Sequence, residues 1–202
     1  VVGSPKKIVE KYLSKSNLDS KEVFTIFIFG GSQGSEFISN FSIKLIKSID
    51  EERIISAKFF MQCPKSMIKK INNDLIKIKS KIIVKEFFYN IDEILQSTSI
   101  AISRAGAGSI TDLINHKIPS ILIPLPSAKD NHQFYNASIM YEHDLAIIIN
   151  QNREDINKAK NYIYEIYNNS NNIKKINERF NKIKVKNSNS LIYNLITNEK
   201  KY

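Results

Sequence analysis

Two glycine-containing stretches are the part of this sequence best suited to bind an anion. Phe24–Phe29 runs into Gly30–Gly34, and Ile100–Ile102 runs into Ser103–Ser109. A strand that passes through a glycine turn into a helix presents free backbone N–H groups at the positive end of the helix dipole. An ordinary strand-to-helix turn has the same composition, so either stretch alone leaves both interpretations open.

Polar side chains also gather after a later strand-like run, Ser120–Ile123. Pro124 and Pro126 end that run, because proline lacks a backbone donor and restricts φ. A helix is expected to follow, capped by Asp130 or Asn131. Its first turn would present three side chains able to hydrogen-bond a ligand, namely His132, Gln133 and Asn136.

These stretches belong to a regular alternation of apolar runs and helical periodicities. Strands are predicted at Phe24–Phe29, Ala57–Met61, Ile82–Val84, Ile100–Ile102, Ser120–Ile123 and Ala146–Ile149. Helices are predicted after Pro5, from Ser35, over Lys65–Ile78 with a cap near Ser66, over Ile91–Gln96, from Ser109, from about His132, and at Ile156–Tyr167 and Ile173–Ile196. Such alternation is typical of an α/β protein with a Rossmann-like parallel sheet of about six strands and helices on both faces.

The carboxyl ends of parallel strands meet at one edge of a sheet, where open α/β proteins bind ligands. Four loops are expected at that edge: Gly30–Gly34, Phe87–Ile91, Ala105–Ser109 and Ser127–Gln133. Residues 1–150 are therefore predicted to form one ligand-binding Rossmann-like domain, with the helices of residues 151–202 packed on it.

Composition narrows the class of protein. The chain of 202 residues is 42% hydrophobic and 25% charged, as in a soluble globular protein. Cys63 is its single cysteine, so no internal disulfide can form and a reducing compartment is expected. No apolar run is long enough for a membrane span, and no signal peptide is recognisable at the N-terminus.

The net charge of +10 leaves several kinds of partner open. From Gln151 onward, 11 Lys+Arg stand against 5 Asp+Glu, so this tail carries +6. A basic balance suits an anionic membrane surface, a nucleic acid or a phosphorylated ligand, and equally a Lys/Asn/Ile-rich composition that only keeps the chain soluble. No nucleic-acid-binding module accompanies the charge, so no nucleic-acid partner is expected.

Several chemistries lack the residues that they need. The glycine turns contain neither the Gly-Lys-Ser/Thr of a P-loop nor the spaced glycines of a dinucleotide-binding turn. No Asp-x-Asp pair and no His/Cys/Asp cluster with metal-ligand spacing occurs, so neither a metal nor a cofactor is expected. The loops also lack the paired carboxylates of retaining glycoside hydrolysis.

Three motifs, in this order, resemble the C-terminal half of the MurG family, the UDP-N-acetylglucosamine transferases that complete lipid II in bacterial cell-wall synthesis. They are Gly30-Gly31-Ser32-Gln33-Gly34, Ser103-Arg104-Ala105-Gly106-Ala107, and Pro124-Leu125-Pro126 followed by Asp130–Ala137. The resemblance extends from Gly3-Ser4-Pro5 to the tail. It implies one half of the GT-B architecture, in which two Rossmann-like domains face a cleft, and the half present here is the one that binds the UDP-sugar.

The resemblance also implies which residues bind the donor, UDP-N-acetylglucosamine. Ser32 would contact the diphosphate from the glycine turn, which also places Gln33 at the donor. Lys7 would add a point charge for phosphate at a position where the family often has arginine. Phe88 would read the uracil edge through its backbone N–H and C=O, where the family often has isoleucine.

A second group of implied donor contacts follows the later glycine turn. The segment that would close over the phosphates and ribose consists of Ala107, Gly108, Ser109, Ile110, Thr111 and Asp112. Ser109 would bind a phosphate, and Asp112 would accept hydrogen bonds from ribose hydroxyls where the family usually has a longer glutamate. His132 and Gln133 would hold the sugar hydroxyls, with Asn136 close by. No catalytic residue is implied in this half.

The implied function is the donor-binding half of an inverting glycosyltransferase that moves N-acetylglucosamine to the muramoyl-pentapeptide lipid in peptidoglycan synthesis. Two alternatives stay open: the donor subunit of a split glycosyltransferase, or another UDP-sugar enzyme on this scaffold, such as an epimerase or a diacylglycerol glycosyltransferase. The implied partners are the missing N-terminal acceptor domain, the undecaprenyl-linked acceptor and an anionic membrane surface. The protein would be cytoplasmic and peripheral on the inner face of the bacterial plasma membrane, and this chain alone is expected to be inactive.

Overall fold

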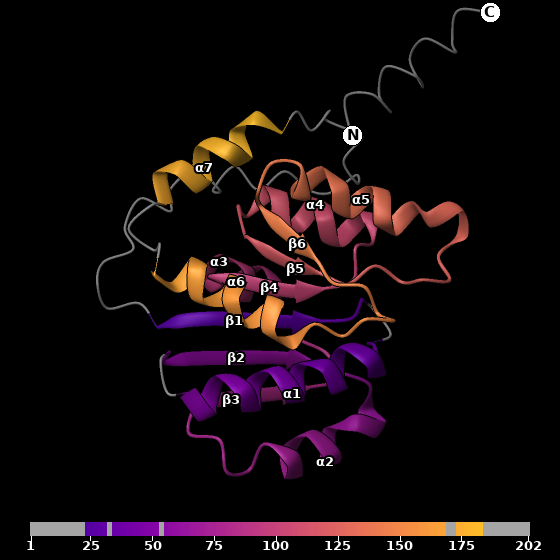
Figure 1. The fold of residues 1–202 in the computed structure, drawn as a ribbon. Helices are drawn as coiled ribbons and strands as arrows, with labels where there is room; N and C mark the ends of the chain where they lie inside the picture. The colour runs from indigo at the N-terminus through magenta and orange to yellow at the C-terminus, as the bar shows by residue number, and fades with distance from the viewer. Residues whose placement is uncertain (1–22, 32–33, 53–54, 169–172, 184–202) are drawn as a thin grey trace, which may run out of the picture.

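Six parallel strands form a single sheet in the computed structural model, which describes residues 23–31, 34–52, 55–168 and 173–183. The strands lie in the order β3-β2-β1-β4-β5-β6 (Figure 1). Their bounds are β1 Phe24–Phe29, β2 Ala57–Gln62, β3 Lys81–Lys85, β4 Ile100–Ser103, β5 Ser120–Leu122 and β6 Ala146–Ile148. The predicted α/β class is confirmed, and the order reverses between β1 and β4, the position where doubly wound sheets open a crevice.

Helices cover both faces of this sheet. Their bounds are α1 Glu36–Glu52, α2 Lys65–Asp74, α3 Ile91–Ser97, α4 Ala107–Asn115, α5 His132–Tyr141, α6 Ile156–Asn168 and α7 Ile173–Lys182, with a 3₁₀ turn at Lys129–Asn131. Apolar residues of α1, α2 and α6 share one core, and those of α3, α4 and α5 share the other. Figure 1 shows α1 and α6 in front of the strands and α2 at the lower end of the molecule.

The central strand β1 is apolar along most of its length because both of its faces are buried. In β1, Ile26 and Ile28 pack into the core beneath α1, whereas Phe27 and Phe29 pack into the opposite core. Alternate side chains of a strand point to opposite faces, so a two-sided core needs a continuous apolar run. Phe180 and Ile183, at the end of α7, join the second core.

Three predicted helix boundaries are wrong. The helix predicted over Lys65–Ile78 ends at Asp74, because Leu75 leaves the helical region with φ −107° and ψ 8° and is buried. Pro64, and not Ser66, occupies the N-cap of α2. The helix predicted from Ser109 begins two residues earlier, because Gly106 takes the extended N-cap conformation with φ −65° and ψ 150°.

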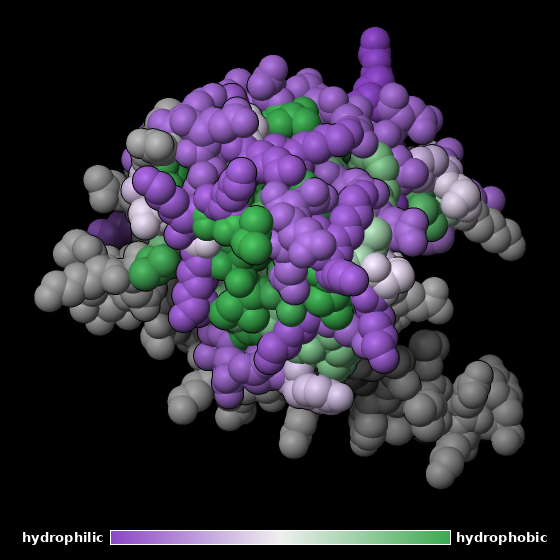
Figure 2. Space-filling model, turned by 90° about the horizontal axis from the view of Figure 1, so that it is seen from below, coloured by the Kyte–Doolittle hydropathy of each residue, from purple (hydrophilic) through white to green (hydrophobic). Residues whose placement is uncertain are grey.

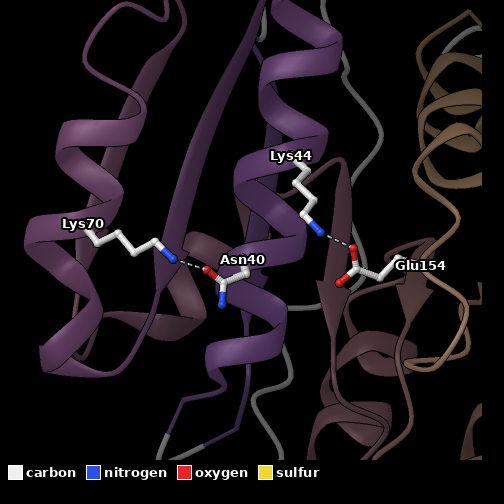
Figure 3. A network of polar contacts seen from close by, with 4 residues as sticks. All are labelled: Asn40, Lys44, Lys70 and Glu154. Carbon is white, nitrogen blue, oxygen red and sulfur yellow. Dashed lines mark hydrogen bonds and ion pairs between the residues drawn. The ribbon is translucent and has the colours of Figure 1, made fainter.

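Polar contacts tie α1 to its neighbours on both sides (Figure 3). The ammonium of Lys70 on α2 donates to the side-chain oxygen of Asn40 at 2.7 Å, and Lys44 forms an ion pair with Glu154, just before α6. Because these contacts are exposed, they are each worth little, and the apolar core supplies most of the stability.

No helix in the described part of the chain is both long and apolar enough to cross a bilayer. The helix expected after Pro5 lies outside the described residues.

Candidate functional site

The ends of β1 and β4 lie side by side at the point where the strand order reverses. Phe29 pairs with Ser103 in the parallel register, so Gly30 and Arg104 are the next residues on the two chains. The glycine turn after β1 and the loop that opens α4 therefore meet at one edge of the sheet. This is the arrangement that the two glycine stretches predicted.

Two glycines of the first turn are required by packing. A Cβ on Gly30 would lie 2.5 Å from the backbone nitrogen of Ser35, and a Cβ on Gly34 would lie 2.7 Å from Cδ of Pro64. Gly34 also has φ +73°, a left-handed conformation that disfavours side chains. The turn is closed by a hydrogen bond from the Gly34 amide to the Gly31 carbonyl at 3.0 Å. Glycine is thus needed at positions 30 and 34 because other atoms of the protein lie close to the backbone there, and not because a ligand approaches it.

The N-terminus of α4 is open to a ligand. Gly106 is its N-cap and supplies no capping side chain, and the Ile110 amide donates to the Gly106 carbonyl at 3.0 Å. The amides before Ile110 have no intrahelical acceptor, as at any helix start. A Cβ on Gly108 would meet no described atom within 4 Å. These amides and the helix dipole suit a phosphate group.

Arg104 is the main site residue for which the sequence suggested no role. It is 8% exposed, and its guanidinium donates to the Ile123 carbonyl at 3.0 Å, to the Pro124 carbonyl at 3.3 Å and to the Ser35 hydroxyl at 3.0 Å. It therefore joins the loops that follow β1, β4 and β5. The signal available in the sequence was an arginine directly after an apolar strand.

The charge of Arg104 is not neutralised by an ion pair with a described carboxylate, since all three acceptors are neutral. Burial lowers the pKa of the guanidinium from its ordinary value, because removal from water disfavours the charged form. The Ser35 hydroxyl oxygen also accepts a hydrogen bond from the Ile38 amide at 3.3 Å. Arg104 therefore lies at the start of α1, where the helix dipole is positive. Arg104 and the start of α1 thus place positive charge between the loops at this end of the sheet.

The loop between β5 and α5 is held by two side-chain amides. The Gln133 oxygen accepts from the Leu125 amide at 3.0 Å, and the Asn136 nitrogen donates to the Ala105 carbonyl at 3.0 Å. Asp130 and Asn131 both have φ +52°, so this loop enters α5 through two left-handed residues. Asn131 is the N-cap but makes no side-chain capping bond, which corrects the predicted role of Asp130 or Asn131 as a capping side chain. Backbone strain of this kind often accompanies binding loops.

Phe88 follows β3 and is almost fully buried, with 3% of its surface exposed. The ring is buried in edge-on contact with Phe27 at 6.0 Å and Phe60 at 5.8 Å between ring centroids. The arrangement is compatible with the prediction that only the main chain of Phe88 reads a base.

The other predicted contacts are distributed as follows. Ile110 and Thr111 are buried, and the Thr111 hydroxyl donates to the Ala107 carbonyl at 2.9 Å, so these two side chains face the protein. Ser109 and Asp112 are half-buried and Ala107 and His132 are exposed. Lys7, Ser32 and Gln33 lie outside the described residues.

Cys63 offers no nucleophile at this edge. It is 1% exposed, and burial, with a smaller contribution from Glu86, raises the pKa of its thiol to about 11. Among the described residues, no group of three His, Cys, Asp or Glu side chains is placed to hold a metal ion. The chemistry that this edge supports best is electrostatic binding of an anionic ligand by backbone amides.

The family is established by comparison with known sequences. Residues 25–192 match the family described as "Glycosyltransferase family 28 C-terminal domain". The chain belongs to this family. It is 29% identical over 184 residues to a UDP-N-acetylglucosamine–N-acetylmuramyl-(pentapeptide) pyrophosphoryl-undecaprenol N-acetylglucosamine transferase of Campylobacter jejuni, covering 91% of this chain and 51% of the relative. The similarly named protein of Rickettsia conorii is 32% identical over 170 residues, covering 83% and 45%. The chain spans about half the length of the curated relatives it matches.

Solved structures show the same fold. MurG of Acinetobacter baumannii has a TM-score of 0.77 at 19% identity, covering 89% of this chain and 51% of that protein. The glycosyltransferase VinC, solved with DTDP, has a TM-score of 0.61 at 11% identity, covering 88% and 41%. This domain of the glycosyltransferase family is therefore placed among glycosyltransferase structures by fold as well as by sequence.

Proposed function

We propose that this chain is the donor-binding half of an inverting glycosyltransferase that moves N-acetylglucosamine from UDP-N-acetylglucosamine to the muramoyl-pentapeptide lipid in peptidoglycan synthesis. Membership of the glycosyltransferase family 28 C-terminal domain and the activity named for its relatives support this assignment. The observation that carries it in the structure is the uncapped start of α4 beside the buried Arg104 guanidinium, at the reversal of the strand order.

The diphosphate would lie at the amides that begin α4, with Ser32 and Lys7 contacting it from the other side. The Phe88 main chain would read uracil, Asp112 would accept from the ribose, and Gln133 and His132 would hold the sugar. Asn136 would act beside them by fixing the Ala105 carbonyl, which it already contacts. Arg104 would add positive potential without reaching the ligand, because its donors are directed at Ser35, Ile123 and Pro124.

Transfer breaks the bond between the sugar and the diphosphate, so negative charge develops on the departing UDP. Preorganised backbone amides at a helix start stabilise such charge strongly, because they need no reorganisation during the reaction. The catalytic base and the acceptor would come from an N-terminal domain outside this chain. In the whole protein, residues 1–150 would form the donor domain, the helices after residue 150 would pack on it, and the lipid acceptor would be met at the inner face of the plasma membrane.

Calorimetry with UDP, UDP-N-acetylglucosamine and thymidine diphosphate tests the proposal. We expect the folded chain to bind both uridine ligands, to bind thymidine diphosphate more weakly, and to be insensitive to a chelator. The chain alone should not transfer N-acetylglucosamine to a lipid I analogue. If millimolar UDP gives no heat of binding, the donor assignment is refuted. If the isolated chain transfers N-acetylglucosamine, the proposal that transfer needs a separate acceptor domain is refuted.

A further inference from the structure

Ser35, directly before α1, is not among the residues assigned to the UDP-sugar. It lies against the end of β1, because a Cβ on Gly30 would stand 2.5 Å from the backbone nitrogen of Ser35 and 2.6 Å from its Cβ. α1 begins at the next residue, Glu36. In doubly wound proteins, the start of the helix after the first glycine turn is a place where phosphates bind. Ser35 is therefore placed at the crevice between β1 and β4.

Two hydrogen bonds fix the side chain of Ser35. Its hydroxyl oxygen accepts from the Ile38 amide at 3.3 Å and from the Arg104 guanidinium at 3.0 Å. A hydroxyl has two lone pairs and one proton, so these two bonds use both lone pairs and leave the proton to donate. Within the described ranges, no residue accepts that proton. Ser35 is only half-buried, so a ligand can approach it.

Arg104 is held so firmly that it can orient Ser35. Its other terminal nitrogen donates to the carbonyls of Ile123 and Pro124, and its guanidinium carbon lies 5.7 Å from the centre of the Phe37 ring. The nitrogen that donates to Ser35 therefore has little freedom to turn toward a ligand. A cation that donates to a hydroxyl oxygen also polarises the O–H bond, which makes the hydroxyl a stronger hydrogen-bond donor.

We propose that Ser35 donates its hydroxyl proton to the diphosphate of the bound UDP-sugar, and that Arg104 is the positioning residue that orients and polarises this hydroxyl. The inference rests on the proposed function, because it needs a nucleotide diphosphate at this edge of the sheet. A fixed, polarised hydroxyl stabilises the negative charge that develops on the departing UDP without reorganisation. The contact acts on phosphate alone, since uracil is assigned to the main chain of Phe88.

The end of the molecule formed by α2 and β3 is a poorer place for such a contact. Figure 2 shows an apolar patch there, enclosed by hydrophilic residues. β2 lies between β3 and β1, so this patch is separate from the glycine turn and from Arg104. Its apolar side chains offer no hydrogen bond to a phosphate, whereas the Ser35 hydroxyl does.

The simplest other role for Ser35 is to cap α1 through the Ile38 amide. A cap affects stability, but it does not distinguish a ligand that has phosphates from one that lacks them. Titration calorimetry with UDP, and with uridine measured by its displacement of UDP, separates the two roles. Binding is measured well below the melting temperature of each variant, and circular dichroism shows that each variant is folded.

Ser35→Ala should bind UDP at least about tenfold more weakly, as expected for the loss of a hydrogen bond to a charged group, and uridine within about twofold of wild type. Ser35→Thr keeps a hydroxyl and should bind UDP within about threefold of wild type. Arg104→Lys should bind UDP about three- to tenfold more weakly. In the double variant Ser35→Ala/Arg104→Lys, the arginine change should add little to the loss, because Arg104 acts through Ser35.

The matched control is Ser39→Ala, one turn further along α1. Ser39 is buried and its hydroxyl donates to the Ser35 carbonyl at 2.9 Å, so this variant removes a hydroxyl from the same helix without touching Arg104. It should bind both ligands within about twofold of wild type. Equal losses of UDP and uridine in Ser35→Ala would overturn the phosphate contact and leave Ser35 as a helix cap. Additive losses in the double variant would overturn the positioning role of Arg104.

Failure of this inference can be told apart from failure of the proposed function. If wild type does not bind UDP, the proposed function is wrong and the contact of Ser35 is wrong with it. If wild type binds UDP and Ser35→Ala binds it equally well, only the contact of Ser35 is wrong.

Discussion

Arg104 is a buried cation whose hydrogen-bond acceptors in the structure are all neutral. Arg104→Gln should lower the free energy of unfolding by about 1.5–3 kcal/mol, the range for hydrogen bonds to charged groups. Arg104→Lys should recover only part of this loss, because an ammonium cannot form the planar fork that reaches Ser35 and Ile123 together. Urea denaturation measures the change, with the exposed Arg153→Gln as control. If Arg104→Gln is as stable as wild type, the hydrogen bonds of Arg104 do not stabilise the three loops that they join.

Asp112 decides whether the start of α4 holds a nucleotide. Asp112→Ala should weaken UDP and UDP-N-acetylglucosamine alike by about 1.5–3 kcal/mol if its carboxylate accepts from the ribose. Titration calorimetry compares it with Asn115→Ala, an exposed residue at the far end of the same helix. A lower melting temperature with unchanged affinities would mean that Asp112 only stabilises the helix.

Substitutions of Gln133 test whether this residue binds the sugar and not the nucleotide. Gln133→Glu keeps an oxygen that accepts from the Leu125 amide, so the loop should stay closed, but it loses the N–H groups that would donate to sugar hydroxyls. We expect weaker binding of UDP-N-acetylglucosamine with UDP nearly unchanged in this variant. Gln133→Ala should show the same selectivity together with a lower melting temperature. Equal losses for both ligands would remove Gln133 from the sugar contact.

At the scale of elements, the two glycine loops differ in why they need glycine. Gly34→Ala should cost about 1–2 kcal/mol for the left-handed backbone and about 1–3 kcal/mol for the contact with Pro64. Gly108→Ala should stabilise α4 by about 0.4–1 kcal/mol, because nothing lies within 4 Å of the added methyl group. If a phosphate approaches the start of α4 closely, Gly108→Ala should nonetheless weaken UDP. Thermal melts and calorimetry on both variants measure this, and the opposite order of stabilities would refute the packing argument.

At the scale of the whole molecule, burial of Cys63 makes stability depend on alkaline pH. Its thiol pKa is raised from an ordinary 9.0 to about 11, so the unfolded chain releases this proton more readily than the folded chain. Stability should therefore be intact below about pH 9 and should fall as pH rises toward about 11. The raised pKa of Tyr164, about 12, acts in the same direction.

Urea unfolding at several pH values checks this prediction, and Cys63→Ala should flatten part of the fall. Alkylation of the single cysteine at pH 8 should also be slow in the folded chain and slower still with saturating UDP. Stability that rises between pH 9 and pH 11 would contradict the sign.

The local pattern of the sequence was sufficient for the architecture. Apolar runs of three to six residues alternating with helical periodicity predicted the parallel sheet. Five of the six predicted strands begin at the observed residue, and the strand predicted from Ile82 begins one residue earlier, at Lys81. Parallel strands also place the polar loops at one edge, so the position of the candidate site followed from order along the chain. The end of α2 and the start of α4 did not follow, because Leu75 and Gly106 take their conformations from packing and loop closure.

Only the tertiary structure revealed which side chains hold the loops together. The contact between Arg104 and Ser35 joins residues 69 positions apart, and that between Asn136 and Ala105 joins residues 31 apart. No periodicity of 2 or 3.6 residues encodes such pairs, since they depend on the order of strands in the sheet. Long-range proximity is a property of the fold, and these contacts could not be derived from local sequence.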